Sequence, residues 1–136
     1  MSETPARKTS LGETSPEYPI SEVSEMTGIS AFTIRYYDKC GFFPELRRGK
    51  NKVRWFSNRD IDALHLVDAL RKSGLSIEGI QYYVRLSLKG DSSRAERMAI
   101  LEARETVLEY QREELEESLK TLRNEFGCLK NKNANS

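Results

Sequence analysis

The chain has 136 residues, of which 32% are charged and 38% hydrophobic, and its 22 Lys and Arg nearly balance 21 Asp and Glu. This size and composition predict one small domain with an extended segment attached. No window reaches the roughly 20 apolar residues of a transmembrane helix, and the N-terminus has no apolar signal core, so we expect a soluble cytoplasmic protein without membrane contact. Two distant cysteines and one histidine indicate neither a disulfide framework nor a zinc cluster, and we expect no metal and no cofactor.

Charge is distributed unevenly along the chain. Residues 1–90 carry a net charge of +3 and residues 91–136 a net charge of −2. The excess of positive charge is greatest over residues 35–59, which contain eight basic residues and only two acidic ones, Asp38 and Glu45. Such a basic surface is typical of a protein that faces phosphates, and equally of a solvated basic loop without a partner. Charge alone favours neither interpretation.

The chain begins with a polar tail, which two short helices follow. The first 17 residues contain one large apolar residue, which predicts a disordered tail over 1–17. Ser21 can cap a first helix that Gly28 ends, and Ser30 can cap a second helix that runs to about Cys40. Two short helices around a tight, Gly-containing turn form a helix-turn-helix.

A small basic hairpin and two further helices are predicted next. Segments 42–46 and 53–56 are β-prone, and the basic segment between them contains Gly and Asn, so together they form a wing. A capping box of Ser57 and Asp60 opens a third helix, and Ser76 opens a fourth. The apolar residues expected to face the core are Ile61, Leu64, Val67 and Leu70 in the third helix and Ile77, Ile80, Val84 and Leu88 in the fourth. The predicted fold is all-α with a small β wing, in a domain over 18–89.

From about residue 92 the pattern changes to one long helix with a heptad repeat. At about 1.5 Å per residue this helix would reach roughly 50 Å, beyond what the domain can cover. We therefore expect a dimerisation helix over 90–129 that pairs with the same helix of a second copy, because the chain has no other long helix for an intramolecular hairpin. Glu105 and Arg112 occupy two seam positions and could set the register of an antiparallel pair. The apolar seam residues are Met98, Leu101, Leu108, Leu115, Leu119, Leu122, Phe126 and Leu129. The polar residues 130–136 are expected to form a disordered tail.

Several short motifs occur in a fixed order between residues 18 and 88. They are Ile20-Ser21-Glu22-Val23, Gly28-Ile29-Ser30, Thr33-Ile34-Arg35-Tyr36-Tyr37-Asp38, Gly41-Phe42, Arg54-Trp55-Phe56, Asp60-Ile61 and Gly74-Leu75-Ser76-Ile77-Glu78-Gly79-Ile80. This series resembles the MerR family of bacterial transcription regulators. The resemblance implies a winged helix-turn-helix homodimer joined by an antiparallel coiled coil and associated with the nucleoid. It also implies binding to a palindromic operator in a promoter with an overlong spacer, which the protein bends and untwists so that RNA polymerase can use it.

Candidate DNA-binding residues lie in the second helix and in the wing. The N-terminal half of a recognition helix faces the major groove, which puts Ser30, Thr33 and above all Arg35 near base edges and phosphates. Tyr36 and Tyr37 can offer hydroxyls to phosphates, although packing in the core is an equal alternative for Tyr37. Trp55 and Phe56 are expected mainly to pack. The wing residues expected at the DNA backbone or minor groove are Arg47, Lys50, Lys52 and Arg54.

The sequence also limits how the protein could sense a signal. Only eight residues follow Cys128, too few to enclose a ligand. This short form resembles the family branch that senses aldehydes through one cysteine in the third helix, but Ala69 stands in that place. Cys40 remains the candidate sensor thiol, with a small buried hydrophobe as the alternative interpretation. The effector stays unknown.

Three classes of function can be compared on these features. A homodimeric DNA-binding regulator explains the basic wing, Arg35 and the long helix together. A role as a coiled-coil interaction or scaffold protein explains the long helix. It does not explain the net charge of +6 around one hairpin. An enzyme is the weakest interpretation, because the sequence offers no catalytic constellation. We therefore predict a transcription regulator that is not an enzyme, whose partners are double-stranded promoter DNA, a second copy and, indirectly, RNA polymerase.

Overall fold

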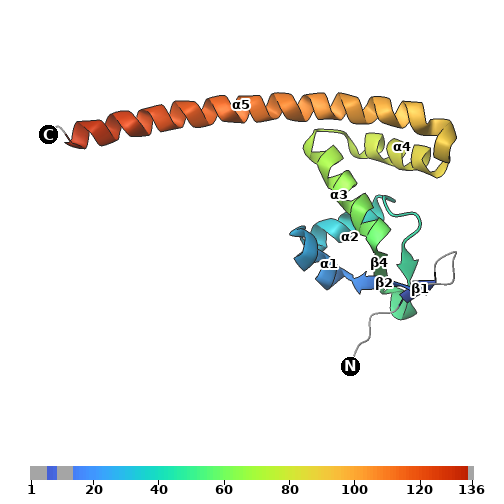
Figure 1. Cartoon of the computed structure of the whole chain (residues 1–136). Helices are drawn as coiled ribbons and strands as arrows, with labels where there is room; N and C mark the ends of the chain where they lie inside the picture. The colour runs from blue at the N-terminus through green and yellow to red at the C-terminus, as the bar shows by residue number, and fades with distance from the viewer. Residues whose placement is uncertain (1–5, 9–13, 135–136) are drawn as a thin grey trace.

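The computed structural model describes residues 6–8 and 14–134 of the chain. A small domain of helices and short strands carries one long helix that runs far past it (Figure 1). The elements are β1 (Ala6–Lys8), β2 (Thr14–Pro19), α1 (Ile20–Thr27), α2 (Ala31–Lys39), β3 (Arg47–Arg48), β4 (Arg54–Ser57), α3 (Asn58–Lys72), α4 (Ile77–Leu88) and α5 (Arg94–Ala134), with 3-10 turns at Lys50–Lys52 and Gly90–Ser93. None of the described helices is both long and apolar enough to span a membrane.

The strands of the described chain form one antiparallel sheet in the order β1-β2-β4-β3. Tyr18 of β2 pairs with Phe56 of β4, whose other edge carries the wing strand β3. The prediction of a disordered tail is therefore wrong for residues 6–8 and 14–17, while 1–5 and 9–13 lie outside the described residues. Composition could not predict that β2 is a strand, because β2 pairs with the edge of β4. That edge is formed by residues about 40 positions further along the chain.

The helix-turn-helix is present, formed by α1 and α2 around a turn at Gly28. Gly28 ends α1 in the left-handed conformation, with φ of 74°, and Ser30 caps α2 by accepting a hydrogen bond from the backbone N–H of Thr33 at 3.1 Å. The capping role predicted for Ser21 is wrong, because α1 already begins at Ile20 after Pro19. The capping box of Ser57 and Asp60 is confirmed at the start of α3.

The core lies where α1 to α4 meet the sheet. The four predicted apolar residues of α3 are buried, but α4 turns Ile80, Tyr83 and Leu86 inward and leaves Leu88 exposed, because it packs between α3 and α5. The segment 42–46 is not a strand; its aromatic residues enter the core instead. Among the described residues, the largest fully buried side chains are Phe42, Phe56, Ile34, Leu64, Ile80, Glu17 and Val23.

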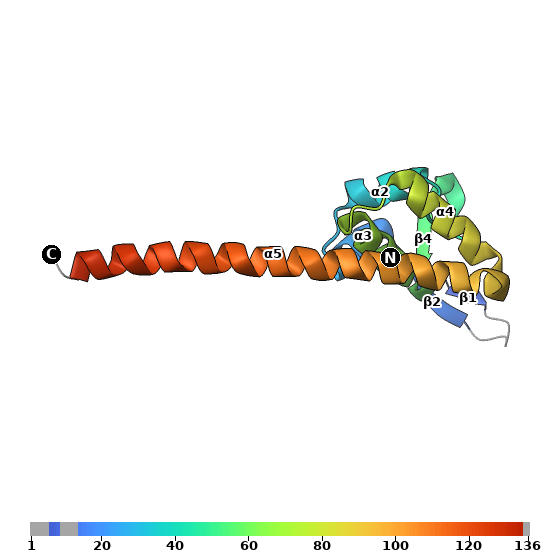
Figure 2. The same ribbon diagram turned by 90° about the horizontal axis from the view of Figure 1, so that it is seen from above.

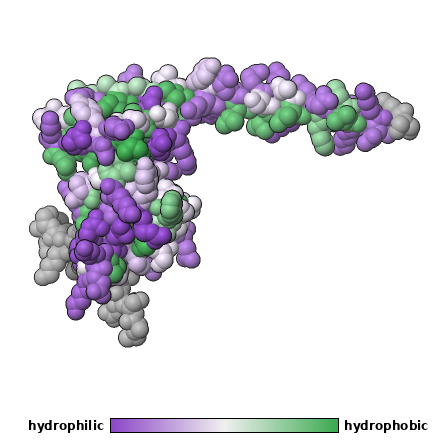
Figure 3. Space-filling view, turned by 180° about the vertical axis from the view of Figure 1, so that it is seen from behind, coloured by the Kyte–Doolittle hydropathy of each residue, from purple (hydrophilic) through white to green (hydrophobic). Residues whose placement is uncertain are grey.

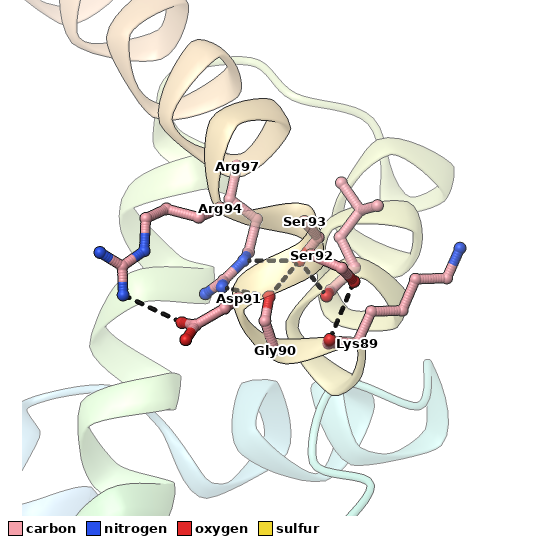
Figure 4. Close-up of polar contacts among 8 residues, drawn as sticks. Lys89, Gly90, Asp91, Ser92, Ser93, Arg94 and Arg97 are labelled. Carbon is pink, nitrogen blue, oxygen red and sulfur yellow. Dashed lines mark hydrogen bonds and ion pairs between the residues drawn. The ribbon is translucent and has the colours of Figure 1, made fainter.

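A compact turn joins α4 to α5 and sets the direction of α5 (Figure 4). Ser93 is buried, with Oγ 2.5 Å from the carbonyl oxygen of Leu86 and 2.9 Å from that of Gly90. Arg97 donates to the same Gly90 oxygen at 2.9 Å and to Ser93 Oγ at 3.0 Å. These contacts fold α5 back along α4, so the two helices lie side by side in Figures 1 and 2.

The helix α5 has 41 residues, or about 60 Å at the usual rise. Its first turns pack on the domain through Ile100 and Leu101, whereas every residue from 109 to 133 except Gly127 is exposed. The helix continues through Gly127 to Ala134, so the prediction of a disordered tail is wrong for 130–134, and 135–136 lie outside the described residues. Extending an existing helix by one turn needs no new nucleus, which explains why the polar end stays helical.

Candidate nucleic-acid interface

The helix α2 has one buried face and one solvent face. Ile34, Tyr37 and Asp38 are buried, and four residues at spacings of three, four and seven point outward. These four are Phe32, Arg35, Tyr36 and Lys39. We call them the outer face of α2. Arg35 and Tyr36 were predicted from the sequence, whereas Phe32 and Lys39 were not, although their spacing from Arg35 could have indicated them.

The two tyrosines of α2 have opposite surroundings. Tyr36 is 47% exposed on the outer face, whereas Tyr37 is 5% exposed and its hydroxyl lies 3.4 Å from Oδ1 of Asp68. Burial, and then the Asp68 carboxylate, raise the pKa of Tyr37. The burial of Tyr37 therefore favours the packing alternative, and its predicted contact with a phosphate stays a prediction.

Ser30 and Thr33 lie at the N-terminal end of α2. Ser30 Oγ donates to Thr33 Oγ1 at 2.9 Å while it accepts from the Thr33 backbone N–H. The two hydroxyls are thus held in a local cap, and their expected role at base edges stays a prediction. Arg35 differs from them because its guanidinium lies on the exposed face.

Asp38 ties the recognition helix to the wing. Its carboxylate, on the buried face of α2, accepts hydrogen bonds from Arg48 at 2.7 and 2.9 Å and from Arg54 at 2.6 Å. Burial alone would raise the pKa of Asp38, but the hydrogen bonds and positive charges of the two arginines outweigh it and lower that pKa. The Asp38 side chain is 4% exposed, so α2, β3 and β4 meet at an ionic cluster around a buried carboxylate.

The predicted wing residues divide into anchors and exposed cations. Arg54 is an anchor because it bonds Asp38, and Arg47 bonds Glu17 of β2 at 2.7 Å while lying over the Trp55 ring. Lys50 and Lys52 are exposed at the tip of the hairpin. The wing thus holds its tip cations clear of the domain while its arginines fix the base of the hairpin.

The hairpin tip adopts an uncommon backbone conformation. Asn51 and Lys52 both have positive φ, 59° and 60°, which is the geometry of a type I′ turn. Asn accepts this region readily, whereas Lys does so at a conformational cost. The backbone N–H of Val53 closes the turn on the carbonyl of Lys50 at 3.3 Å.

Comparison with known proteins identifies this arrangement. The family model described as the MerR HTH family regulatory protein matches residues 18–86, which include α1 to α3 and most of α4. The chain belongs to the MerR family. It is a transcriptional regulator of the MerR type, as the motifs of α2 and α4 predicted, and its relatives are regulators and not enzymes.

Individual relatives of this MerR chain cover most of its length. An uncharacterized HTH-type transcriptional regulator of Haemophilus influenzae is 31% identical over 105 residues, or 77% of this chain and 78% of the relative. The regulator AdhR of Bacillus subtilis is 32% identical over 96 residues, or 71% of this chain and 64% of AdhR.

Solved MerR structures share the fold. HiNmlR, a MerR family regulator lacking the sensor domain and bound to promoter DNA, superposes with a TM-score of 0.70 at 30% identity, over 82% of this chain and 88% of HiNmlR. A MerR family regulator of Bacillus thuringiensis gives 0.73 at 28% identity, over 82% of this chain and 97% of that one.

The two positions considered for a sensor thiol, Ala69 and Cys40, lie in different parts of this MerR chain. Ala69 lines an open groove between α3 and α5 with Leu66, Leu70, Leu101 and Leu108. Cys40 is half-buried at the end of α2, where its carbonyl accepts a hydrogen bond from Gln81 Nε2 at 2.9 Å. Within residues 6–8 and 14–134, no three His, Cys, Asp or Glu residues come together as a metal site. A sensing role for Cys40 therefore stays a prediction.

Proposed function

We propose that this chain binds a palindromic promoter operator as a homodimer and bends and untwists it to control transcription by RNA polymerase. The observation that carries the proposal is the ionic cluster of Asp38, Arg48 and Arg54, which locks the wing to the recognition helix. In this proposal the joint holds the outer face of α2 and the tip lysines against the same DNA duplex. A rigid surface of this kind can hold DNA in a distorted shape, since bending must be offset by contacts made at the same time.

The surface combines two kinds of DNA recognition. Arg35 on α2 can bond base edges in the major groove, whereas Lys50 and Lys52 at the wing tip can neutralise phosphates. Tyr36 can donate its hydroxyl to a phosphate. A cytoplasmic, nucleoid-associated location follows from this proposal, because the promoter is where the protein acts.

The exposed stripe of α5 supports the homodimer. In Figure 3 its apolar residues gather along one side of the projecting helix. Leu115, Leu122 and Phe126 are each 66–68% exposed, although a heptad repeat of this length is stable only when a partner covers it. A second copy supplies an equal stripe, which makes the pairing symmetric.

An antiparallel register also agrees with the groove between α3 and α5. The C-terminal end of α5 from the second copy would lie over the partly buried start of α5 in the first copy. It would fill the space beside Leu66 and Ala69. In one such register three apolar pairs and two pairs of unlike charge would meet across the dimer, while Glu105 and Arg112 would face Leu122 and Leu115 instead of each other. The apolar pairs are Met98 with Leu129, Leu101 with Phe126 and Leu108 with Leu119, and the charged pairs are Glu102 with Arg123 and Arg104 with Glu125.

Footprinting combined with sedimentation tests the proposal. The purified chain is probed on the DNA upstream of its own gene at two salt concentrations, with and without a thiol-reactive aldehyde. We expect protection of a palindrome between promoter elements, hypersensitive bases at its centre, and a dimer by sedimentation. No protection at low salt would refute DNA binding and favour the coiled-coil interaction protein instead. An aldehyde effect that Cys40→Ser removes would identify Cys40 as the sensor thiol.

A further inference from the structure

Phe32 is the most exposed large apolar side chain among the described residues. Its exposed fraction is 76%, higher than that of any residue in the apolar stripe of α5. A single exposed apolar residue is common on protein surfaces, so its position matters more than its exposure. Phe32 occupies the first turn of α2, on the same outer face as Arg35, Tyr36 and Lys39.

The neighbours of Phe32 indicate what covers it. Arg35 and Lys39 follow on the same face, so the surface around the ring is basic, and it suits DNA better than an apolar protein surface. Ser30 and Thr33 bond each other, which leaves the phenyl ring as the main outward group of the first turn. A ring without polar atoms can recognise its partner only by apolar contact.

The major groove offers one apolar group to such a ring. Hydrogen-bond donors and acceptors line the base edges, and the C5-methyl of thymine is the exception. We infer that Phe32 recognises a thymine methyl in each half-site of the operator and thereby selects thymine over cytosine at that position. This inference rests on the proposed function, because it requires α2 to enter the major groove.

The test removes the methyl and the ring separately. Operators are selected from a randomised duplex library with the wild-type chain, and each thymine is then replaced by 2′-deoxyuridine, which lacks only the methyl. At one symmetric position, removing the methyl should weaken wild-type binding about four-fold per half-site and about 15-fold for both. Phe32→Ala should bind the thymine operator as weakly as the wild type binds the deoxyuridine one, and deoxyuridine should cause it no further loss.

Two controls make the result specific. Met26→Ala removes an exposed apolar side chain from α1, where Met26 is 54% exposed, and should keep the full response to deoxyuridine. Placing 5-methylcytosine at the same position of a cytosine operator should restore part of the wild-type affinity and none for Phe32→Ala. Because Phe32 lies outside the core, thermal unfolding of Phe32→Ala should match the wild type.

The outcomes separate this inference from the proposed function. If the wild type selects no sequence, the proposed function fails and the inference with it. If it selects an operator but Phe32→Ala and the wild type lose affinity equally at every deoxyuridine, methyl recognition by Phe32 is wrong while DNA binding stands. If Phe32→Ala binds DNA normally but no longer controls transcription, the ring contacts a protein such as RNA polymerase, and the inference is overturned.

Discussion

Replacing Asp38 by Asn tests whether the ionic cluster joins the wing to the recognition helix. The change keeps the size of the side chain but removes its charge and one of two oxygens that accept from Arg48 and Arg54. Hydrogen bonds to charged groups contribute about 1.5–3 kcal/mol each when buried. The side chains of Arg48 and Arg54 are 44% and 23% exposed, so water compensates part of the loss. We therefore expect the free energy of unfolding to fall by about 2–3 kcal/mol. This is less than the roughly 3–5 kcal/mol lost when one partner of a fully buried ion pair is removed.

The assay is urea unfolding at one fixed protein concentration, because dimerisation stabilises the folded chain. Asp91→Asn is the matched control, since Asp91 pairs with Arg94 at 2.9 Å but is 90% exposed, and its stability should hardly change. Operator affinity should fall in Asp38→Asn as the wing loses its orientation. Equal stability of Asp38→Asn and wild type would refute the role of the cluster.

Acid provides a second test of the same cluster. Because the pKa of Asp38 is lowered by folding, its stabilisation is present above the unfolded pKa and is lost as the pH falls through the folded one. The stability difference between wild type and Asp38→Asn should thus be constant near neutrality and shrink below about pH 4. A difference that persists undiminished in acid would mean that the carboxylate charge is not its source.

Base readout, the wing tip and the dimer seam can each be tested by a single substitution. Arg35→Ala should cost about 1–3 kcal/mol at the selected operator and relax its sequence preference, and unchanged discrimination would remove Arg35 from the base edges. Lys52→Gly should lower the slope of log affinity against log salt by about one unit for each phosphate that Lys52 neutralises, without loss of stability because glycine suits a positive φ; an identical slope would exclude Lys52 from the interface. Leu115→Lys should weaken the dimer at least about ten-fold in sedimentation by placing a charge in the seam, whereas Glu117→Lys, on the outer side of the helix, should not. A dimeric Leu115→Lys would show that the seam lies elsewhere.

Features that depend on a few neighbouring residues could be predicted from the sequence alone. The caps at Ser30 and Ser57 and the stop at Gly28 were predicted correctly, because each is decided within about four positions along the chain. The heptad leucines likewise predicted a long helix with one apolar stripe, since spacing alone fixes the face of a helix. Even the family could be identified from the order of short motifs.

The contacts that each helix face makes are set by packing between distant parts of the chain. Tyr36 and Tyr37 are adjacent and chemically alike, yet one is exposed and the other buried, because the orientation of α2 is set by packing against α1 and the core. Asp38 could be interpreted only as a charge until Arg48 and Arg54, 10 and 16 residues away, were brought to it by the hairpin. The tail strand β2 likewise depends on an edge formed about 40 residues later. Contacts between distant residues exist only once the chain has folded, and local patterns carry no record of them.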